Sequence, residues 1–157
     1  MIRNIIIKKE TEKKIGYISV QLLNVANHIS MLNRLYLNEK YDGDLELKKI
    51  IKKKIAGYKS QDTKKNKYCV DSFITYDLVL EKLVISRLKC CYCKKITLLA
   101  FENKREPLQW TLDRIDNSIG HSNKNTIICC LKCNLERRCL NDEKFKFTKQ
   151  MRLIKKI

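Results

Sequence analysis

Two cysteine pairs constrain the fold of this chain more than any other feature of its sequence. Cys90 and Cys93 form one C-x-x-C motif, and Cys130 and Cys133 form the other. Together they supply four thiolates, the number that a tetrahedral structural zinc ion takes. The two-residue spacer makes a tight turn in which both sulfurs of a pair reach one ion. We therefore predict a structural Zn²⁺ site with these four ligands, and the intervening segment leaves room for a β-hairpin.

The other cysteines fall outside this pattern. Cys91 and Cys129 adjoin the two motifs, and we predict that they are small buried residues. The main alternative is that these two cysteines replace a neighbour in the metal site. Cys69 and Cys139 have no partner at a spacing typical of metal ligands, so we interpret them as structural residues.

The sequence favours a reducing compartment. The opening segment, residues 1–10, has only a short apolar run before charge returns, which is too short for the core of a signal peptide. The chain also lacks the long apolar run that a transmembrane helix needs. We expect a protein that is not secreted and lies in the cytoplasm or nucleus of a host cell, or in a virion. There, eight cysteines favour metal ligation over disulfides.

The charge indicates what the chain binds. Lys and Arg number 34 against 17 Asp and Glu, a formal net charge of +17. So basic a balance favours a polyanionic partner, either nucleic acid or an anionic membrane surface. Of these we expect nucleic acid, with double-stranded DNA first. The alternative interpretation is a solvated, lysine-rich surface.

The first part of the chain, residues 1–87, is predicted to be a basic, mostly helical region. Apolar residues at three- and four-residue steps predict helices over 19–38, 44–56 and 75–88. Between the last two lies the polar segment 57–68, interpreted either as an exposed connector or as a loop that follows a phosphate backbone. Its candidate nucleic-acid ligands are Lys64, Lys65 and Lys67.

The second part, residues 88–157, has a different pattern. β-Branched and aromatic residues predict short strands over 96–101 and 108–115, with a brief extended piece over 126–129. A short helix is expected over 134–140, and a last helix begins at Asn141 or Asp142. Helices followed by strands and further helices indicate an α+β fold.

The motifs resemble the HNH, or His-Me finger, endonuclease family. The matching residues are Cys90, Cys93, the L-D-R-I-D segment 112–116, Gly120, Asn125, and the C-x-x-C-N segment 130–134. This version is similar to a zinc-stapled branch found in phage and large-virus proteins, and the resemblance covers about residues 88–150. It implies a ββα-metal unit held by the four-cysteine zinc site, preceded here by the basic helical region.

The resemblance also implies a catalytic site. The family hydrolyses phosphodiester bonds, mainly in DNA, with one divalent ion. Asp113 would be a ligand of that ion, and Asn134, which opens the helix after the second motif, would be another. Asn125 would orient the catalytic group through a side-chain hydrogen bond. Carboxylate and amide oxygens are hard ligands that suit Mg²⁺ or Mn²⁺ rather than a second zinc.

The sequence departs from the family where the general base should stand. The family places a His directly after the metal-binding Asp, and here that residue is Arg114. A guanidinium stays protonated and cannot accept a proton. Three alternatives follow: Arg114 clamps the phosphate while a metal-bound water attacks, His121 swings in as the base, or the site is inactive. Asp116 is either a third ligand or, as we favour, a turn cap.

Two functions fit these residues. The first is a DNA endonuclease whose Lys132, Arg137 and Arg138 flank the site and hold the phosphate backbone. The second is a non-catalytic zinc protein that binds nucleic acid on the same fold. His28 lies in a helical pattern and is interpreted as a packed or surface residue rather than as a base.

Overall fold

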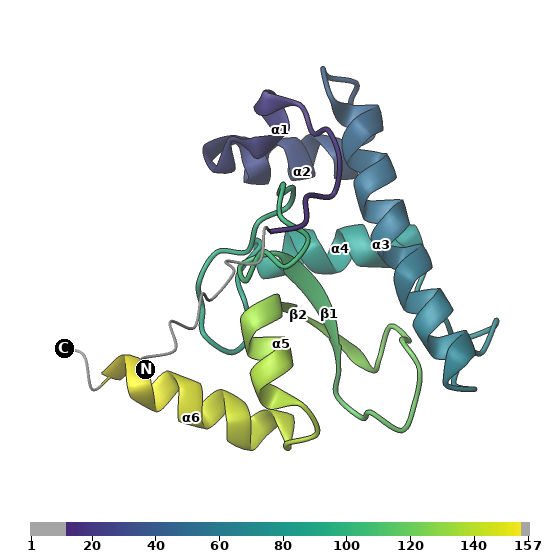
Figure 1. The fold of residues 1–157 in the computed structure, drawn as a ribbon, viewed down its shortest axis with the longest axis vertical. Coiled ribbons are helices and arrows are strands. Elements are labelled where there is room, and N and C mark those ends of the chain that lie inside the picture. The colour runs from purple at the N-terminus through teal and green to yellow at the C-terminus, as the bar shows by residue number, and fades with distance from the viewer. Residues whose placement is uncertain (1–11, 155–157) are drawn as a thin grey trace, which may run out of the picture.

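A computed structural model describes residues 12–154, with side chains as far as residue 151, so the prediction for residues 1–10 lies outside it. The fold is α+β, as predicted (Figure 1). Its helical elements are α1 (Val20–Leu23), the 3-10 helix η1 (Val25–Asn27), α2 (His28–Tyr36), α3 (Asp44–Lys64), α4 (Tyr76–Ser86), α5 (Leu131–Arg137) and α6 (Asp142–Ile154). Within residues 12–154, none of the helices has an apolar stretch long enough to cross a bilayer.

The helix predicted over 19–38 is interrupted. Asn24 adopts an extended conformation with ψ of 102°, and its side-chain oxygen accepts a hydrogen bond from the backbone N–H of Ala26. Asn favours such local bonds because its short side chain competes with the helical backbone ladder. The prediction of one continuous helix is therefore wrong at this position, and α2 begins only at His28.

Helix α3 is longer than predicted, and most of the proposed connector 57–68 belongs to it. Two residues of its last turns, Tyr58 and Asp62, are one helical turn apart and both are buried. Packing of this face against the rest of the chain outweighs the low helix propensity of Gly57 and the polar sequence around it. Asp44 is the first helical residue rather than the cap, which is Gly43.

Helix α4 confirms the third predicted helix, and Thr75 caps it by accepting a hydrogen bond from the N–H of Leu78. The main hydrophobic core combines residues from both predicted parts of the chain. Leu32 and Leu83 from the helical region pack in one cluster with Trp110 and Leu112. The domain boundary at residue 87 stays a prediction.

The sheet is a single antiparallel hairpin of β1 (Trp110–Arg114) and β2 (Thr126–Cys130), in which Asp113 lies opposite Ile127. The second predicted strand and the brief extended piece are thus partners. The strand predicted over 96–101 is wrong: this segment makes only isolated bridges, at Ile96 and Leu98. Its backbone bonds to other segments instead, with the N–H of Leu99 donating to the His28 ring.

The second C-x-x-C motif starts a helix directly. Cys130 ends β2, and its sulfur accepts a hydrogen bond from the N–H of Cys133 at 3.4 Å. Helix α5 therefore begins at Leu131, and Asn134 lies in its first turn instead of opening it. Helix α6 follows after Asn141, whose side chain accepts a bond from the Lys144 N–H.

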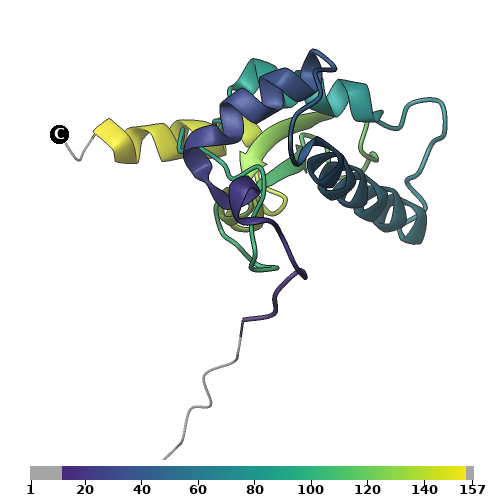
Figure 2. The same cartoon turned by 90° about the horizontal axis from the view of Figure 1, so that it is seen from above.

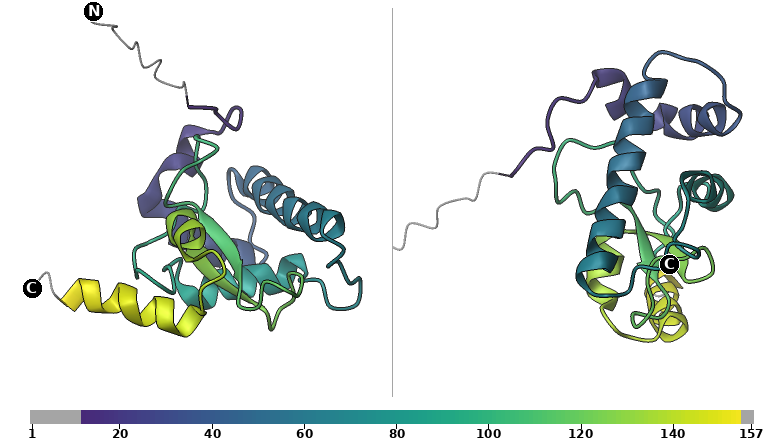
Figure 3. Two further views of the ribbon diagram at one scale, coloured as in Figure 1. Left: turned by 60° about the horizontal axis from the view of Figure 1, so that its bottom comes forward. Right: turned by 90° about the vertical axis from the view of Figure 1, so that its right-hand side faces the viewer.

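The hairpin lies between α5 on one side and α3 on the other (Figures 1 and 3). The loop that joins the two strands, residues 115–125, reaches the C-terminal end of α3, where the N–H of His121 bonds to Asp62. Helix α6 extends away from the rest of the molecule, as seen from above in Figure 2. In this arrangement, residues of α3, β1 and α5 line one cleft.

Candidate metal centre and basic cleft

The four predicted ligands come together. The sulfurs of Cys90, Cys93, Cys130 and Cys133 all lie within 4.8 Å of one another, and those of Cys93 and Cys130 are 3.9 Å apart. Tetrahedral zinc with Zn–S bonds of about 2.3 Å would separate its sulfurs by about 3.8 Å. The spacing therefore fits a tetrahedral thiolate site, and this group could hold a metal ion.

The predicted burial of the two neighbouring cysteines is confirmed for one of them. Cys129 is fully buried, and its sulfur lies 3.3 Å from the Thr111 hydroxyl. Cys91 is partly exposed, and neither residue belongs to the group of four. Cys69 and Cys139 are exposed. These last two are therefore not packed in the interior, and their interpretation as structural residues stays a prediction.

Most of the predicted catalytic residues line a cleft of about 850 Å³. Helix α3, strand β1, the loop after it and helix α5 all contribute to its walls. Four of the five predicted catalytic residues line it: Asp113, Arg114, His121 and Asn134. Asp113 and Arg114 are neighbours on β1, while the strand loop supplies His121 and α5 supplies Asn134.

Asp113 is a buried, fully bonded carboxylate. Its Oδ2 accepts from the Tyr92 hydroxyl at 2.5 Å and from Nε of Arg137 at 2.7 Å, and its Oδ1 lies 3.3 Å from Nη2 of the same Arg. Burial raises the pKa of Asp113, while Tyr92 and Arg137 act in the opposite direction. Arg137 is only 1% exposed. The prediction that it holds a phosphate backbone is therefore wrong, because it is already paired inside the protein.

Asn134 reaches the same side of the sheet as Asp113. Its Nδ2 donates to the Thr111 hydroxyl at 3.1 Å, and Thr111 and Asp113 share a face of β1 because strand residues alternate. Among the described residues, the amide oxygen of Asn134 has no hydrogen-bond donor. An unpaired amide oxygen thus belongs to a residue that lines the same cleft as the buried carboxylate.

Arg114 points to the opposite face of β1. Its Nη1 lies 3.8 Å from Oδ1 of Asp62 and donates to the carbonyl of Ile119 at 3.4 Å. The side chain is 13% exposed, so its charge remains within reach of the cleft. Asp62 thus compensates the cation of Arg114 from α3.

His121 is buried rather than an exposed loop residue. Its side chain is 4% exposed, and Nδ1 lies 2.8 Å from Oδ1 of Asp62. The other oxygen of Asp62 accepts the backbone N–H of His121 at 2.7 Å. Burial lowers the pKa of His121 and the Arg114 charge adds to this, while Asp62 acts in the opposite direction. The sequence pattern did not indicate a role for Asp62, because this residue lies in the segment 57–68, which was predicted to be a connector or a loop.

His28 is also buried, as a packed histidine. One ring nitrogen accepts from the Leu99 N–H, and the other bonds to the carbonyl of Leu22. With both nitrogens occupied by backbone groups, His28 is held as a neutral core residue and has no position left for a reaction.

Asn125 holds the loop rather than a catalytic side chain. Its amide oxygen accepts the N–H of Asp116, and its Nδ2 donates to the carbonyls of Asp116 and Gly120. The predicted role in orienting a catalytic group is thus corrected to one in shaping the loop that carries His121. Asp116 is the turn cap that we favoured, because its side chain accepts from the N–H and hydroxyl of Ser118.

The loop approaches α3 so closely that only glycine fits at position 120. A Cβ there would lie 2.4 Å from the Lys67 carbonyl oxygen and 2.8 Å from Oδ2 of Asp62. Real Cβ atoms essentially never come so near to backbone oxygen. The glycine of the motif is therefore explained by the docking of the loop onto α3.

We expect Gly120→Ala to destabilise the protein by about 1–3 kcal/mol, the usual cost of overpacking. Urea unfolding should show this as a lower midpoint. The control is Gly57→Ala, whose Cβ meets nothing within 4 Å in helix α3. Alanine is the better helix former, so that variant should gain up to about 1 kcal/mol. Equal shifts in the two variants would contradict close docking at Gly120.

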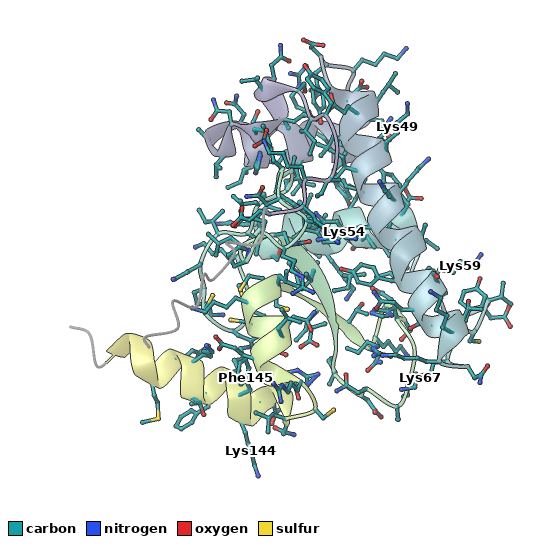
Figure 4. The ribbon with its side chains drawn as sticks, viewed as in Figure 1. Lys49, Lys54, Lys59, Lys67, Lys144 and Phe145 are labelled. Carbon is teal, nitrogen blue, oxygen red and sulfur yellow. The ribbon has the colours of Figure 1, made fainter. Side chains whose placement is uncertain are left out.

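Lysines of α3 face the cleft. Lys49, Lys53 and Lys54 lie at helical steps on the side of α3 that lines it. Lys54 points toward the sheet (Figure 4), donates to the carbonyl of Trp110 and lies 4.4 Å from the centre of its ring. Burial lowers the pKa of Lys54 to about 7. None of these three was among the residues predicted to bind nucleic acid.

The predicted binding residues have mixed positions. Lys64, Lys65, Lys132 and Arg138 are exposed. Lys67 is partly buried and donates to the carbonyl of Asn117 at 2.5 Å, so it holds the loop to the end of α3. The exposed four remain candidates for contact with a polyanion.

Comparison with protein-family models, with curated proteins and with solved structures finds no match. The resemblance to HNH endonucleases therefore stays a prediction from the motif residues of this chain.

Proposed function

We propose that this protein is a divalent-metal-dependent endonuclease of the HNH type that hydrolyses phosphodiester bonds in DNA. One observation carries the proposal. A single cleft contains a carboxylate, an unpaired amide oxygen, a histidine and an arginine, namely Asp113, Asn134, His121 and Arg114, beside the lysines of α3. Hard oxygen ligands next to cations are what a site for a metal ion and a phosphodiester requires.

In this proposal the four-cysteine group holds a structural Zn²⁺. Cys90 and Cys93 lie directly before the segment that leads to β1, while Cys130 and Cys133 join β2 to α5. One ion would thus tie the hairpin to α5 and fix where Asn134 stands relative to Asp113. Reduced thiolates are needed for this, so the proposal includes a reducing compartment, as in the cytoplasm, the nucleus or a virion.

Asp113 and Asn134 would hold the catalytic Mg²⁺ or Mn²⁺. Asp113 faces α5 from β1, Asn134 on α5 bonds to Thr111 of the same strand, and both side chains offer hard oxygens. The bonds from Tyr92 and Arg137 fix the orientation of the Asp113 carboxylate. When bound, the ion would neutralise charge on the scissile phosphate.

The lysines would hold the DNA backbone. Lys49 and Lys53 face the cleft, and Lys132 and Arg138 are exposed on and after α5. Their contacts would be with phosphates rather than bases, so binding should be insensitive to sequence and should weaken steeply with salt. The net charge of +17 acts in the same direction over the whole molecule.

A second function is favoured by the state of Asp113. Both of its oxygens already accept bonds from Arg137, which compensates the negative charge that would attract a cation. If Asp113 always stays bonded to Arg137, it cannot bind a metal ion. The protein would then be a zinc-containing nucleic-acid-binding protein without nuclease activity. The two functions differ in one measurable property, which is cleavage.

The test is nicking of supercoiled plasmid by zinc-loaded protein with Mg²⁺ or Mn²⁺. We expect nicking by the wild type, and a decrease of more than about 100-fold in Asn134→Ala and Asp113→Asn, beyond what loss of an outer-shell partner costs. Asp71→Asn is the control, because it removes one exposed carboxylate outside the cleft. Salt-sensitive binding without nicking in either metal would instead establish the second function.

A further inference from the structure

The structure contains a histidine–carboxylate pair that joins the strand loop to α3. We propose that His121, oriented by Asp62, is the general base of the nuclease site and takes the place of the histidine that Arg114 replaces. This inference depends on the proposed nuclease function. It assigns Asp62, which lies outside the segment that resembles the family, a positioning role in the reaction.

The geometry fixes which nitrogen of His121 is free. Asp62 accepts a hydrogen bond at Nδ1, so in the neutral ring the proton stays on Nδ1 and the lone pair on Nε2. No hydrogen bond to Nε2 is made by any described residue. That atom is not among the buried polar atoms that lack a partner. Since His121 lines the cleft, its Nε2 is open to water there.

Asp62 is placed for this task by two bonds to the same residue. One oxygen orients the ring at 2.8 Å and the other holds the backbone N–H at 2.7 Å. The pair is also packed closely: Asp62 is 1% exposed, and the ring of His121 lies 4.7 Å from that of Tyr58. An ion pair on the surface would fix the ring and the loop less firmly. Solvent screens its attraction, and this weak attraction has to offset the lost freedom of two side chains.

The charges around the ring favour its neutral form at neutral pH. Arg114 from β1 and burial both lower the pKa of His121, while Asp62 from α3 and the more distant Asp113 raise it. Among the residues that the structure describes, Tyr58 of α3 is a further titratable side chain whose ring packs on that of His121. A neutral imidazole is the form that can accept a proton.

The proposed step is hydrolysis of a phosphodiester bond by water, with His121 as the base. A water molecule in the cleft attacks phosphorus, so that a new P–O bond forms and its proton moves to Nε2 of His121. The P–O bond to the leaving sugar oxygen breaks, and that oxygen takes a proton from solvent. His121 then returns its proton to solvent. Arg114 stays cationic and cannot accept the proton, so the base has to be another residue.

The activity test compares the pH dependence of nicking in three proteins. The wild-type rate should rise with pH through a value below about 6.5 and level off near neutrality, because the base must be unprotonated. His121→Gln should lose about 10²–10⁴-fold and this acidic limb. Asp62→Asn should also lose rate, because an amide can donate to Nδ1 and so move the ring proton to Nε2.

A second measurement needs no activity. Imidazole NMR of the wild type should show His121 with its proton on Nδ1 and a pKa below that of a free histidine, and the Asp62→Asn variant should show the other tautomer. Folding of each variant is checked in the same spectra.

The outcomes separate the two proposals. A wild type that never nicks DNA overturns the nuclease function and this inference with it. If the wild type nicks and a folded His121→Gln matches its rate and pH profile, only the inference is overturned. A His121 proton on Nε2 in the wild type overturns it as well.

Discussion

Removing the metal from the four-cysteine site should unfold the C-terminal half of this protein. The hairpin has only two strands, and its junction with α5 is made by the cysteines themselves. The cysteines lie outside the main core, in a small cluster with Tyr92 and Phe145, so metal binding supplies much of the free energy that holds α5 on the hairpin. Apparent binding energies of structural zinc reach about 10–16 kcal/mol in small peptides. We therefore expect a larger loss here than from any other single change.

The experiment is chelation of purified protein followed by circular dichroism and amide NMR. The protein should contain one equivalent of zinc, and the resonances of β1, β2 and α5 should lose their dispersion when it is removed. Cys133→Ser should reproduce this effect. Cys139→Ser is the matched control, because that cysteine is exposed and lies outside the site. A chelated protein with an unchanged spectrum, or one purified without metal, would exclude the zinc site.

The second large effect is expected at Arg137. Replacing it by Met should destabilise the protein by about 3–5 kcal/mol, since the change leaves the carboxylate of Asp113 buried without its partner. Asp113 is 4% exposed and Arg137 1% exposed, so water from the cleft can replace only part of the lost bonds. Arg138→Met is the matched control: the neighbouring side chain is exposed and should change stability by about 0.5 kcal/mol or less.

Urea unfolding at low ionic strength measures this difference. In the double variant Arg137→Met with Asp113→Asn, part of the loss should be recovered, because no uncompensated charge remains. Saturating Mg²⁺ should stabilise Arg137→Met more than the wild type, since an ion would take over the role of the guanidinium. Equal unfolding midpoints for Arg137→Met and Arg138→Met would contradict a buried pair.

The pattern of cysteines was sufficient to predict the sulfur cluster because its determinants are local. A spacer of two residues fixes how the sulfurs of one turn are placed, and two such turns have to share any single ion. The structure brings Cys90, Cys93, Cys130 and Cys133 together, as expected. Turn residues were similarly readable: Asp116 caps its own turn through Ser118, two residues away.

The elements predicted incorrectly are those whose fate depends on distant partners. Residues 96–101 have the composition of a strand, yet they form only isolated bridges. The backbone N–H of Leu99 donates a hydrogen bond to the His28 ring instead of to a neighbouring strand. Residues 57–64 have the composition of a loop, yet they remain helical. Tyr58 is buried there, and its hydroxyl accepts a hydrogen bond from the N–H of Leu112. Local propensity is worth tenths of a kcal/mol per residue, and tertiary burial outweighs it.

The sequence by itself determined the four-cysteine cluster, a strand over 110–114 with an extended segment after the turn, the helices that follow it, and an arginine where a base was expected. It could not determine that Arg137 neutralises Asp113 or that Asp62 orients His121. Both pairs join residues far apart in the chain, and each exists only because packing α5 and α3 on the hairpin removes water between them. Side-chain type fixes which groups can ionise, while burial and neighbouring charges decide which of them remain available for chemistry.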